Sequence, residues 1–490
     1  MLQAKSIVQK KNKNNPYLFV NLIFSFFPIS FVLGSLIVNV NLLLMCCLGI
    51  YHLKSKILKT KFDFPIKIIF LFFLIIFFST SLSVAKALYF GGYDSFYLER
   101  LTKSILFFRF FLFLIIIYLL SKFNILHFKY FFLTAAFTSV LISLDIIYQY
   151  IFGFNIIGLK KGPNFSNAGF FGDEYIAGGF IQRFSFFAIF LTIFTLKNKN
   201  YTKFISTVIV ICILTAGILF AGNRMPLILF TFGLCLVFLL NLKIKKILFV
   251  SCVVMFILLK FIISSNEPYK TYLAGSYGTF PFYFKNIISK TWGFGINKWH
   301  KTERWDWEHS RKGQQEPEKE KFLGQKTHFY EAVYESFHRR IFVTAFETWG
   351  ANKIFGNGIK SFQRDCWKLG EQPNINLGED LYPDKKNLLC SAHPHNYYLQ
   401  ILTETGIVGL FIVSVIALLF IVFIFKNFKF VKQINIENLI LLSAIISLIL
   451  ETLPLKSTGS LFTTNNATYL TLISSIVLSH KTLIKIKNFR

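Results

Sequence analysis

The sequence predicts an all-α polytopic membrane protein with about 12 transmembrane helices and one large external, mainly helical loop between spans nine and ten. The 490-residue chain is 54% hydrophobic and holds 62 phenylalanines, which is too apolar for a soluble protein of this length. The apolar residues gather in runs of roughly 20, the length that crosses a bilayer. The net charge of +29 comes from lysine clusters between these runs.

Twelve apolar segments follow one another along the chain. They cover about 17–34, 36–53, 64–82, 101–120, 130–151, 176–196, 204–221, 225–241, 246–264, 400–425, 436–453 and 464–480. Lysines cluster before the first segment and after each even-numbered one. Because cytoplasmic loops are enriched in Lys and Arg, this alternation predicts that both termini are cytoplasmic. Lysines placed in this way also disfavour nucleic acid as a partner.

The spans divide the chain into residues 1–264 with spans one to nine, 265–395 with the polar loop, and 396–490 with spans ten to twelve and a cytoplasmic tail. All six tryptophans lie in the loop, which favours a folded cap. Cys366 and Cys390 also lie in this loop. Outside the cytoplasm they can form a disulfide or remain as free thiols, and the sequence favours neither alternative. No Cys or His cluster has zinc spacing, and we expect no metal and no cofactor.

Ionisable residues near membrane depth are costly and commonly functional. Arg224 lies in the short external seam between spans seven and eight, either as an anion contact or as an interfacial arginine. Asp173 and Glu174 precede span six, where they either cap the helix or contact a substrate. Arg183 lies about two turns into that span and nine residues after Glu174, so it needs a partner from another helix or from a ligand.

An amphipathic helix over about 338–351 is expected within the loop, followed by the turn GNG. Arg339 and Arg340 open this helix. They form either a solvated charge pair or a pair in which one arginine faces the site.

The stretch SAHPHNYYLQILTETGIVGL places His393 and His395 at the mouth of span ten. Asn396, Gln400 and Glu404 follow at a spacing of four, so they share one helix face. A polar seam of this kind faces the bundle interior or an aqueous cavity. A neutral imidazole there can accept a proton near pH 7, which favours a base or a substrate contact over a structural cap. Two histidines are too few ligands for a metal site.

Together these residues resemble the O-antigen ligase and polymerase family of bacterial envelope glycosyltransferases. The resemblance covers about residues 165–480. The segments that carry it are AHPHNYYLQILTETGIVGL, the helix ending in GNGIKSF, the seam GNRMPL, FFGDEYIAGGFIQRF and the tail ETLPLKSTGSLFTTNNATYL. It implies a multi-pass enzyme of the bacterial inner membrane with a periplasmic active site. Such enzymes transfer a glycan from undecaprenyl diphosphate to a hydroxyl without a metal.

The resemblance implies catalytic roles for His395, Arg224 and Arg340. The arginines would stabilise the diphosphate leaving group, and His395 would accept the proton of the acceptor hydroxyl or orient that hydroxyl, with inversion at the anomeric carbon. The family seam often reads Ser-Arg or Glu-Arg, whereas here it reads Asn223-Arg224, which leaves the role of the neighbour open. The further expected substrate-binding residues are Arg183, Glu174, His393, Asn396, Gln400 and Glu404.

The expected partners are membrane lipids, a glycan donor on undecaprenyl diphosphate, and an acceptor. Lipid A–core would make the protein an O-antigen ligase of lipopolysaccharide biosynthesis, and a second lipid-linked glycan would make it an O-antigen polymerase. A lipid-linked glycan flippase is the alternative of another class. Transporters commonly consist of two matching halves, and this sequence contains no internal repeat.

Overall fold

A computed structural model describes residues 17–92, 94–162, 166–196, 200–239, 245–265, 337–371, 389–431, 435–454 and 456–487. Within these ranges the protein has sixteen α-helices and one short 3-10 helix. The chain forms two compact units, Met1–Met255 with Phe337–Arg490, and Phe256–Ser336. All described residues other than Phe256–Ser265 lie in the first unit. The tryptophan-rich part of the predicted loop before residue 337 lies outside the described residues.

Every predicted span coincides with helical structure, because a chain in hydrocarbon must satisfy its backbone hydrogen bonds within the segment. Among the described helices, seven are long and apolar enough to cross a membrane, so this is a multi-pass membrane protein. The helices at the predicted spans are α2 (Leu18–Ser25) with α3 (Phe27–Leu33), α4 (Ser35–Leu53), α6 (Phe64–Tyr89), α7 (Ser95–Lys122), α8 (Lys129–Phe152), α9 (Ala177–Thr195), α10 (Asn200–Phe220), α11 (Arg224–Leu239), α12 (Lys245–Ser265), α18 (Tyr397–Val431), α19 (Ile436–Glu451) and α20 (Thr464–Lys487).

The first predicted span is two short helices, not one. Helix α2 ends at Ser25 and α3 begins at Phe27, with Pro28 in the first turn of α3. A proline fits the first turn of a helix but cannot donate the hydrogen bond that would continue the preceding one. The segment therefore breaks where its proline lies.

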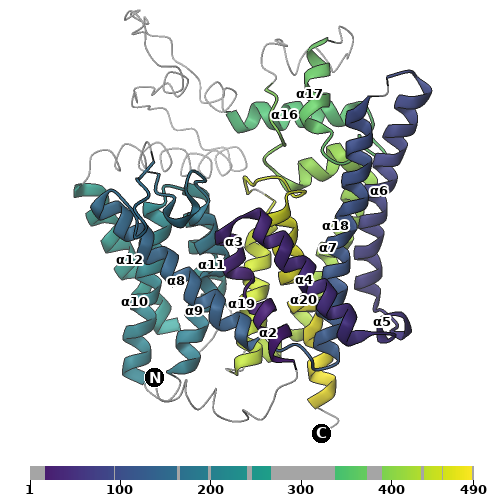
Figure 1. Ribbon diagram of the computed structural model, residues 1–490. Coiled ribbons are helices and arrows are strands. Elements are labelled where there is room, and N and C mark those ends of the chain that lie inside the picture. Colours follow the sequence, from purple (N-terminus) through teal and green to yellow (C-terminus); the bar gives the residue numbers. More distant parts are fainter. Residues whose placement is uncertain are drawn as a thin grey trace, which may run out of the picture. The chain divides into compact units, whose positions relative to one another are not determined.

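Helix α9 is at the centre of the helix packing. It packs against α8, α10, α11 and α19. A helix that is apolar on all sides is typically buried. Helix α6, at the right of Figure 1, packs against α7 and the long α18. The predicted loop helix is confirmed as α16 (Phe337–Gly350), and a second one, α17 (Phe362–Glu371), follows it.

Helix α18 contains a break at Gly406, whose φ of 67° is left-handed. The turn after α16 pairs with the backbone that the break leaves open. The amides of Asn357 and Gly358 donate to the carbonyls of Thr403 and Glu404, at 3.0 and 2.8 Å. The GNG turn therefore takes the place of helical hydrogen bonds and fixes the loop helices to α18.

Replacing Gly356 with alanine is expected to lower stability by at least about 2 kcal/mol, because its φ of 68° disfavours a side chain. A Cβ atom there would also lie 2.5 Å from the backbone nitrogens of Thr405 and Gly406. Thermal unfolding of the purified protein in detergent measures the effect. Gly350→Ala is the matched control, since a Cβ atom at Gly350 meets nothing within 4 Å. Equal unfolding of the two variants would contradict this account of the break.

Candidate functional site

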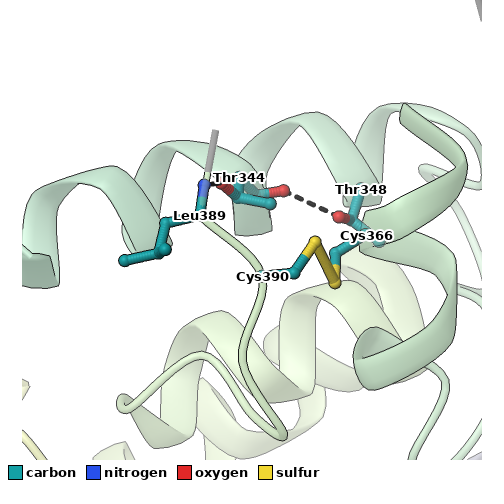
Figure 2. Close-up of a disulfide and its surroundings, with 5 residues drawn as sticks. All are labelled: Thr344, Thr348, Cys366, Leu389 and Cys390. Atoms are coloured by element: carbon teal, nitrogen blue, oxygen red, sulfur yellow. Dashed lines mark hydrogen bonds between the residues drawn. A yellow bond between two sulfur atoms is a disulfide. The ribbon is translucent and has the colours of Figure 1, made fainter. Parts of the chain in front are cut away.

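Of the two alternatives for Cys366 and Cys390, the structure has the disulfide, which holds the chain just before the histidine pair. Cys366 on α17 is bonded to Cys390, with 5.7 Å between the Cα atoms. The neighbouring Leu389 amide donates to Thr344 Oγ1 on α16 at 3.0 Å, and Figure 2 shows these two links side by side. The segment that leads to His395 is therefore attached to both loop helices.

His393 and His395 lie together in a non-helical segment, as the intervening proline predicts. Their ring centroids are 4.2 Å apart. His395 adopts a left-handed backbone with φ 54°, and its Nε2 lies 3.3 Å from Ser391 Oγ. Its carbonyl accepts from the Thr458 amide at 2.8 Å. A non-glycine residue in this conformation persists only where its surroundings hold it, and such residues concentrate at functional sites.

His393 is partly buried, as His395 is. Burial lowers its pKa below the ordinary value, and a hydrogen bond to the Thr458 backbone opposes this. Its Nε2 is buried without a hydrogen-bond partner among the described residues. A histidine with a lowered pKa stays neutral at pH 7, so one ring nitrogen remains able to accept a proton.

Asn396 caps α18. Its Oδ1 accepts from the amides of Tyr398 and Leu399, at 3.0 and 3.2 Å, which is the bonding of a helix N-cap. Its Nδ2 donates to the carbonyl of Pro454 at 2.7 Å. The cap therefore also attaches the histidine segment to the connection between α19 and α20.

The predicted polar seam of α18 is buried and hydrogen-bonded within the protein. Gln400 Nε2 donates to Glu404 Oε1 at 3.1 Å and to Ser460 Oγ at 2.8 Å. Glu404 Oε2 accepts from the Lys360 amide at 2.6 Å. These bonds join α18 to the GNG turn and to the connection between α19 and α20. Whether Gln400 and Glu404 also contact a substrate stays a prediction.

Arg183 has the interhelical partner that the sequence required. Its guanidinium makes two hydrogen bonds to Glu451 at the end of α19, at 2.7 and 3.0 Å. Lys456 Nζ lies 2.6 Å from Glu451 Oε2, the oxygen that also accepts from Arg183 Nε. Glu451 is 0% exposed, and the Arg183 side chain is 20% exposed. The three side chains, here called the 183–451–456 cluster, carry one excess positive charge.

The cluster adjoins the histidine segment. Tyr397, two residues after His395, donates its hydroxyl to Glu451 Oε1 at 2.7 Å. Asn466 Oδ1, in the first turn of α20, accepts from Arg183 at 2.7 Å. The Arg183 guanidinium also lies over the ring of Tyr469, 4.6 Å from its centroid. Residues from α9, α18, α19 and α20 therefore meet at one place, which Tyr397 joins to the histidine segment.

Arg224 and Glu174 lie on two segments that contact each other. Arg224 is exposed and begins α11, immediately after the short seam that the sequence predicts. The side chain of Asn223 donates to the carbonyl of Tyr175 at 2.9 Å, so the seam packs on the segment that holds Glu174. The capping alternative for Asp173 and Glu174 is wrong, because α9 begins at Ala177 and has no acid in its first turn. Turns around Gly172 separate the acids from the helix.

Arg340 lies in the first turn of α16. The loop helices are anchored again at α17, where Arg364 forms an ion pair with Asp94, the N-cap of α7. The hydrogen bond from this guanidinium lowers the pKa of the Asp94 carboxyl. The two loop helices, α16 and α17, are thus together linked to α18, to α7 and to the histidine segment.

Removing the disulfide with Cys366→Ser and Cys390→Ser is expected to destabilise the protein by about 3 kcal/mol, since the bridge closes a loop of 24 residues. The apparent melting temperature in detergent should fall. In the unfolded chain, reduction should make two further cysteines reactive to maleimide in wild type and none in the double variant. Cys235→Ser, at an exposed free cysteine, is the control. An unchanged melting temperature for the double variant would contradict a structural role for the bridge.

The sequence analysis did not single out Glu451 and Lys456, nor the two arginines of α7, Arg100 and Arg109. A signal for them was present, because each is an ionisable residue inside or at the end of an apolar run. The sequence could not say which of these charges meet, since Arg183 and Glu451 are 268 residues apart. Among the described residues, no group of three or more His, Cys, Asp and Glu side chains is arranged to hold a metal ion.

No curated protein matches the whole sequence closely enough to count as a relative. Residues 207–414 match the profile of a protein family described as O-antigen ligase. The matched range includes Arg224, Arg340, His395 and Glu404, and it leaves out Arg183, Glu451 and Lys456. Over residues 207–414 the chain is therefore similar to the O-antigen ligase family.

Proposed function

We propose that the protein transfers a glycan from undecaprenyl diphosphate to lipid A–core at the periplasmic face of the inner membrane, as an O-antigen ligase. The observation that carries the proposal is the position of the histidine pair beside a buried cluster with excess positive charge. The similarity to this family supports glycan transfer in general. Twelve spans with cytoplasmic termini would place this site and residues 265–395 on the periplasmic side.

In the proposed reaction, His395 accepts the proton of the acceptor hydroxyl or orients that hydroxyl. The acceptor oxygen attacks the anomeric carbon from the side opposite the diphosphate. The bond from that carbon to the diphosphate oxygen breaks, so the configuration inverts. Arg224 and Arg340 stabilise the negative charge of the departing diphosphate, with Arg183 and Lys456 as a second source of positive charge and without a metal ion.

Burial lowers the pKa of Lys456, and the Glu451 carboxylate opposes that effect. A buried carboxylate that holds both cations keeps them charged in a low-dielectric site, where a developing anion is stabilised more strongly than in water. Glu174, His393, Asn396, Gln400 and Glu404 keep their proposed substrate-binding roles.

A transfer assay tests the proposal. The full chain in lipid nanodiscs receives an undecaprenyl-diphosphate-linked glycan together with either lipid A–core or more of the same donor. Glycan appearing on lipid A–core supports the ligase. Lengthening of the lipid-linked glycan would replace the ligase with the polymerase. No transfer to either acceptor, with the donor intact, would refute both and favour a transporter.

A further inference from the structure

Lys360, in the GNGIK turn, has a left-handed backbone with φ 55°. For a long side chain this conformation costs roughly 1–2 kcal/mol relative to glycine. Buried groups hold the turn in place. The Arg100 guanidinium on α7 donates to the carbonyls of Asn357 and Ile359, and the Glu404 carboxylate accepts from the Lys360 amide. The backbone of the turn is therefore held from both sides at Lys360.

The Lys360 ammonium group has no ion pair or hydrogen bond within the described part of the chain, although it is half-buried. Burial lowers its pKa, and the nearby charges of Lys103 and Arg109 lower it further. Two carboxylates are near, but both already have partners. Glu99 pairs with Lys103, and Glu404 accepts from the backbone of the turn and from Gln400.

Arg109 on α7 adds a second cation with spare donors. One of its terminal nitrogens lies 3.4 Å from Thr464 Oγ1 at the start of α20, a long contact to a neutral hydroxyl. Its Nε is buried and has no hydrogen-bond partner among the described residues. A buried N–H without an acceptor is costly, so an acceptor from outside the protein would be favoured there.

Arg109 lies near an exposed apolar surface of α7. Arg109 is in α7, a candidate membrane span. Ile105 and Leu106, one helical turn before Arg109, are 54% and 53% exposed. A lipid chain lying on these two residues would bring its headgroup close to Arg109.

We propose that Lys360 and Arg109 form a binding site for the phosphate group of a membrane lipid. Phosphate oxygens supply the acceptors that both side chains lack, and the apolar face of α7 supplies the place for the chain. The site shares no residue with the 183–451–456 cluster or with His395, although Glu404, a proposed substrate-binding residue, holds the backbone of the Lys360 turn. It concerns lipid binding, so it does not depend on the transfer reaction proposed above.

Binding to the full chain in a phosphate-free non-ionic detergent tests the proposal with three probes. Undecaprenyl monophosphate carries both parts of the ligand, undecaprenol carries only the chain, and inorganic phosphate carries only the anion. Wild type should bind the monophosphate best. Lys360→Gln and Arg109→Gln should each weaken that binding by about tenfold or more, because each removes a charged hydrogen bond. Lys103→Gln is the matched control, since Glu99 already neutralises Lys103, and should change binding by less than about twofold.

Lys360→Gly separates binding from folding. Glycine relaxes the left-handed backbone, so this variant should unfold at the same temperature as wild type or a higher one, yet bind the monophosphate about tenfold more weakly. Unchanged affinity in the Lys360 and Arg109 variants would overturn the inference. So would equal binding of undecaprenol, binding of inorganic phosphate alone, or no binding by wild type. Weakened binding in a protein that transfers no glycan would sustain the lipid site and refute only the proposed function.

Discussion

Replacing His395 with alanine is expected to lower glycan transfer by about 10²- to 10⁴-fold, the range that loss of a general base or a positioned acceptor produces. The loss should fall on kcat more than on KM, because the proton moves as the transition state forms. The measurement is the initial rate of transfer in nanodiscs, from the undecaprenyl-diphosphate-linked donor to the acceptor that wild type uses.

Two variants accompany this measurement. His52→Ala changes a histidine on α4 that packs edge-on against Tyr17 and Tyr51, so it should leave transfer unchanged. His395→Asn keeps a small polar side chain and tolerates a left-handed backbone, which tests whether the backbone rather than the imidazole matters. Transfer within threefold of wild type in the folded His395→Ala protein would exclude His395 as base and as positioning group.

The second large effect is expected at Glu451. Glu451→Ala leaves Arg183 and Lys456 buried side by side without a counter-charge, and breaking such a buried pair typically costs about 3–5 kcal/mol. The apparent melting temperature in detergent should fall far below that of wild type. Transfer by the fraction that remains folded should fall as well, because Arg183 and Tyr397 lose the group that holds them.

A triple variant with methionine at Arg183, Glu451 and Lys456 is the informative comparison. Apolar residues of similar volume commonly replace a buried ion cluster at little cost, so stability should recover while transfer stays low. Glu99→Ala, which removes an exposed ion pair with Lys103, should change the melting temperature little. A Glu451→Ala protein as stable as wild type would mean that water reaches the two cations.

The candidate site could be predicted only in part. His393, His395 and Asn396 stand out because imidazole and amide groups are unusual at the mouth of an apolar run. The structure joins them to Thr458 and Pro454, on a connection that looks like an ordinary loop in the sequence. The break in α18 was not predicted, because a glycine such as Gly406 is tolerated within a membrane helix, and only the turn packed against it shows that the helix stops there.

The sequence by itself determined where the helices lie, including the loop helix that begins near Arg340. Hydrocarbon leaves a backbone no alternative to internal hydrogen bonds, so long apolar runs become helices whatever their neighbours are. Only the tertiary structure decided which charges meet. Arg183, Glu451 and Lys456 each need a partner, but their pairing depends on how α9, α19 and α20 pack, and no local pattern records that.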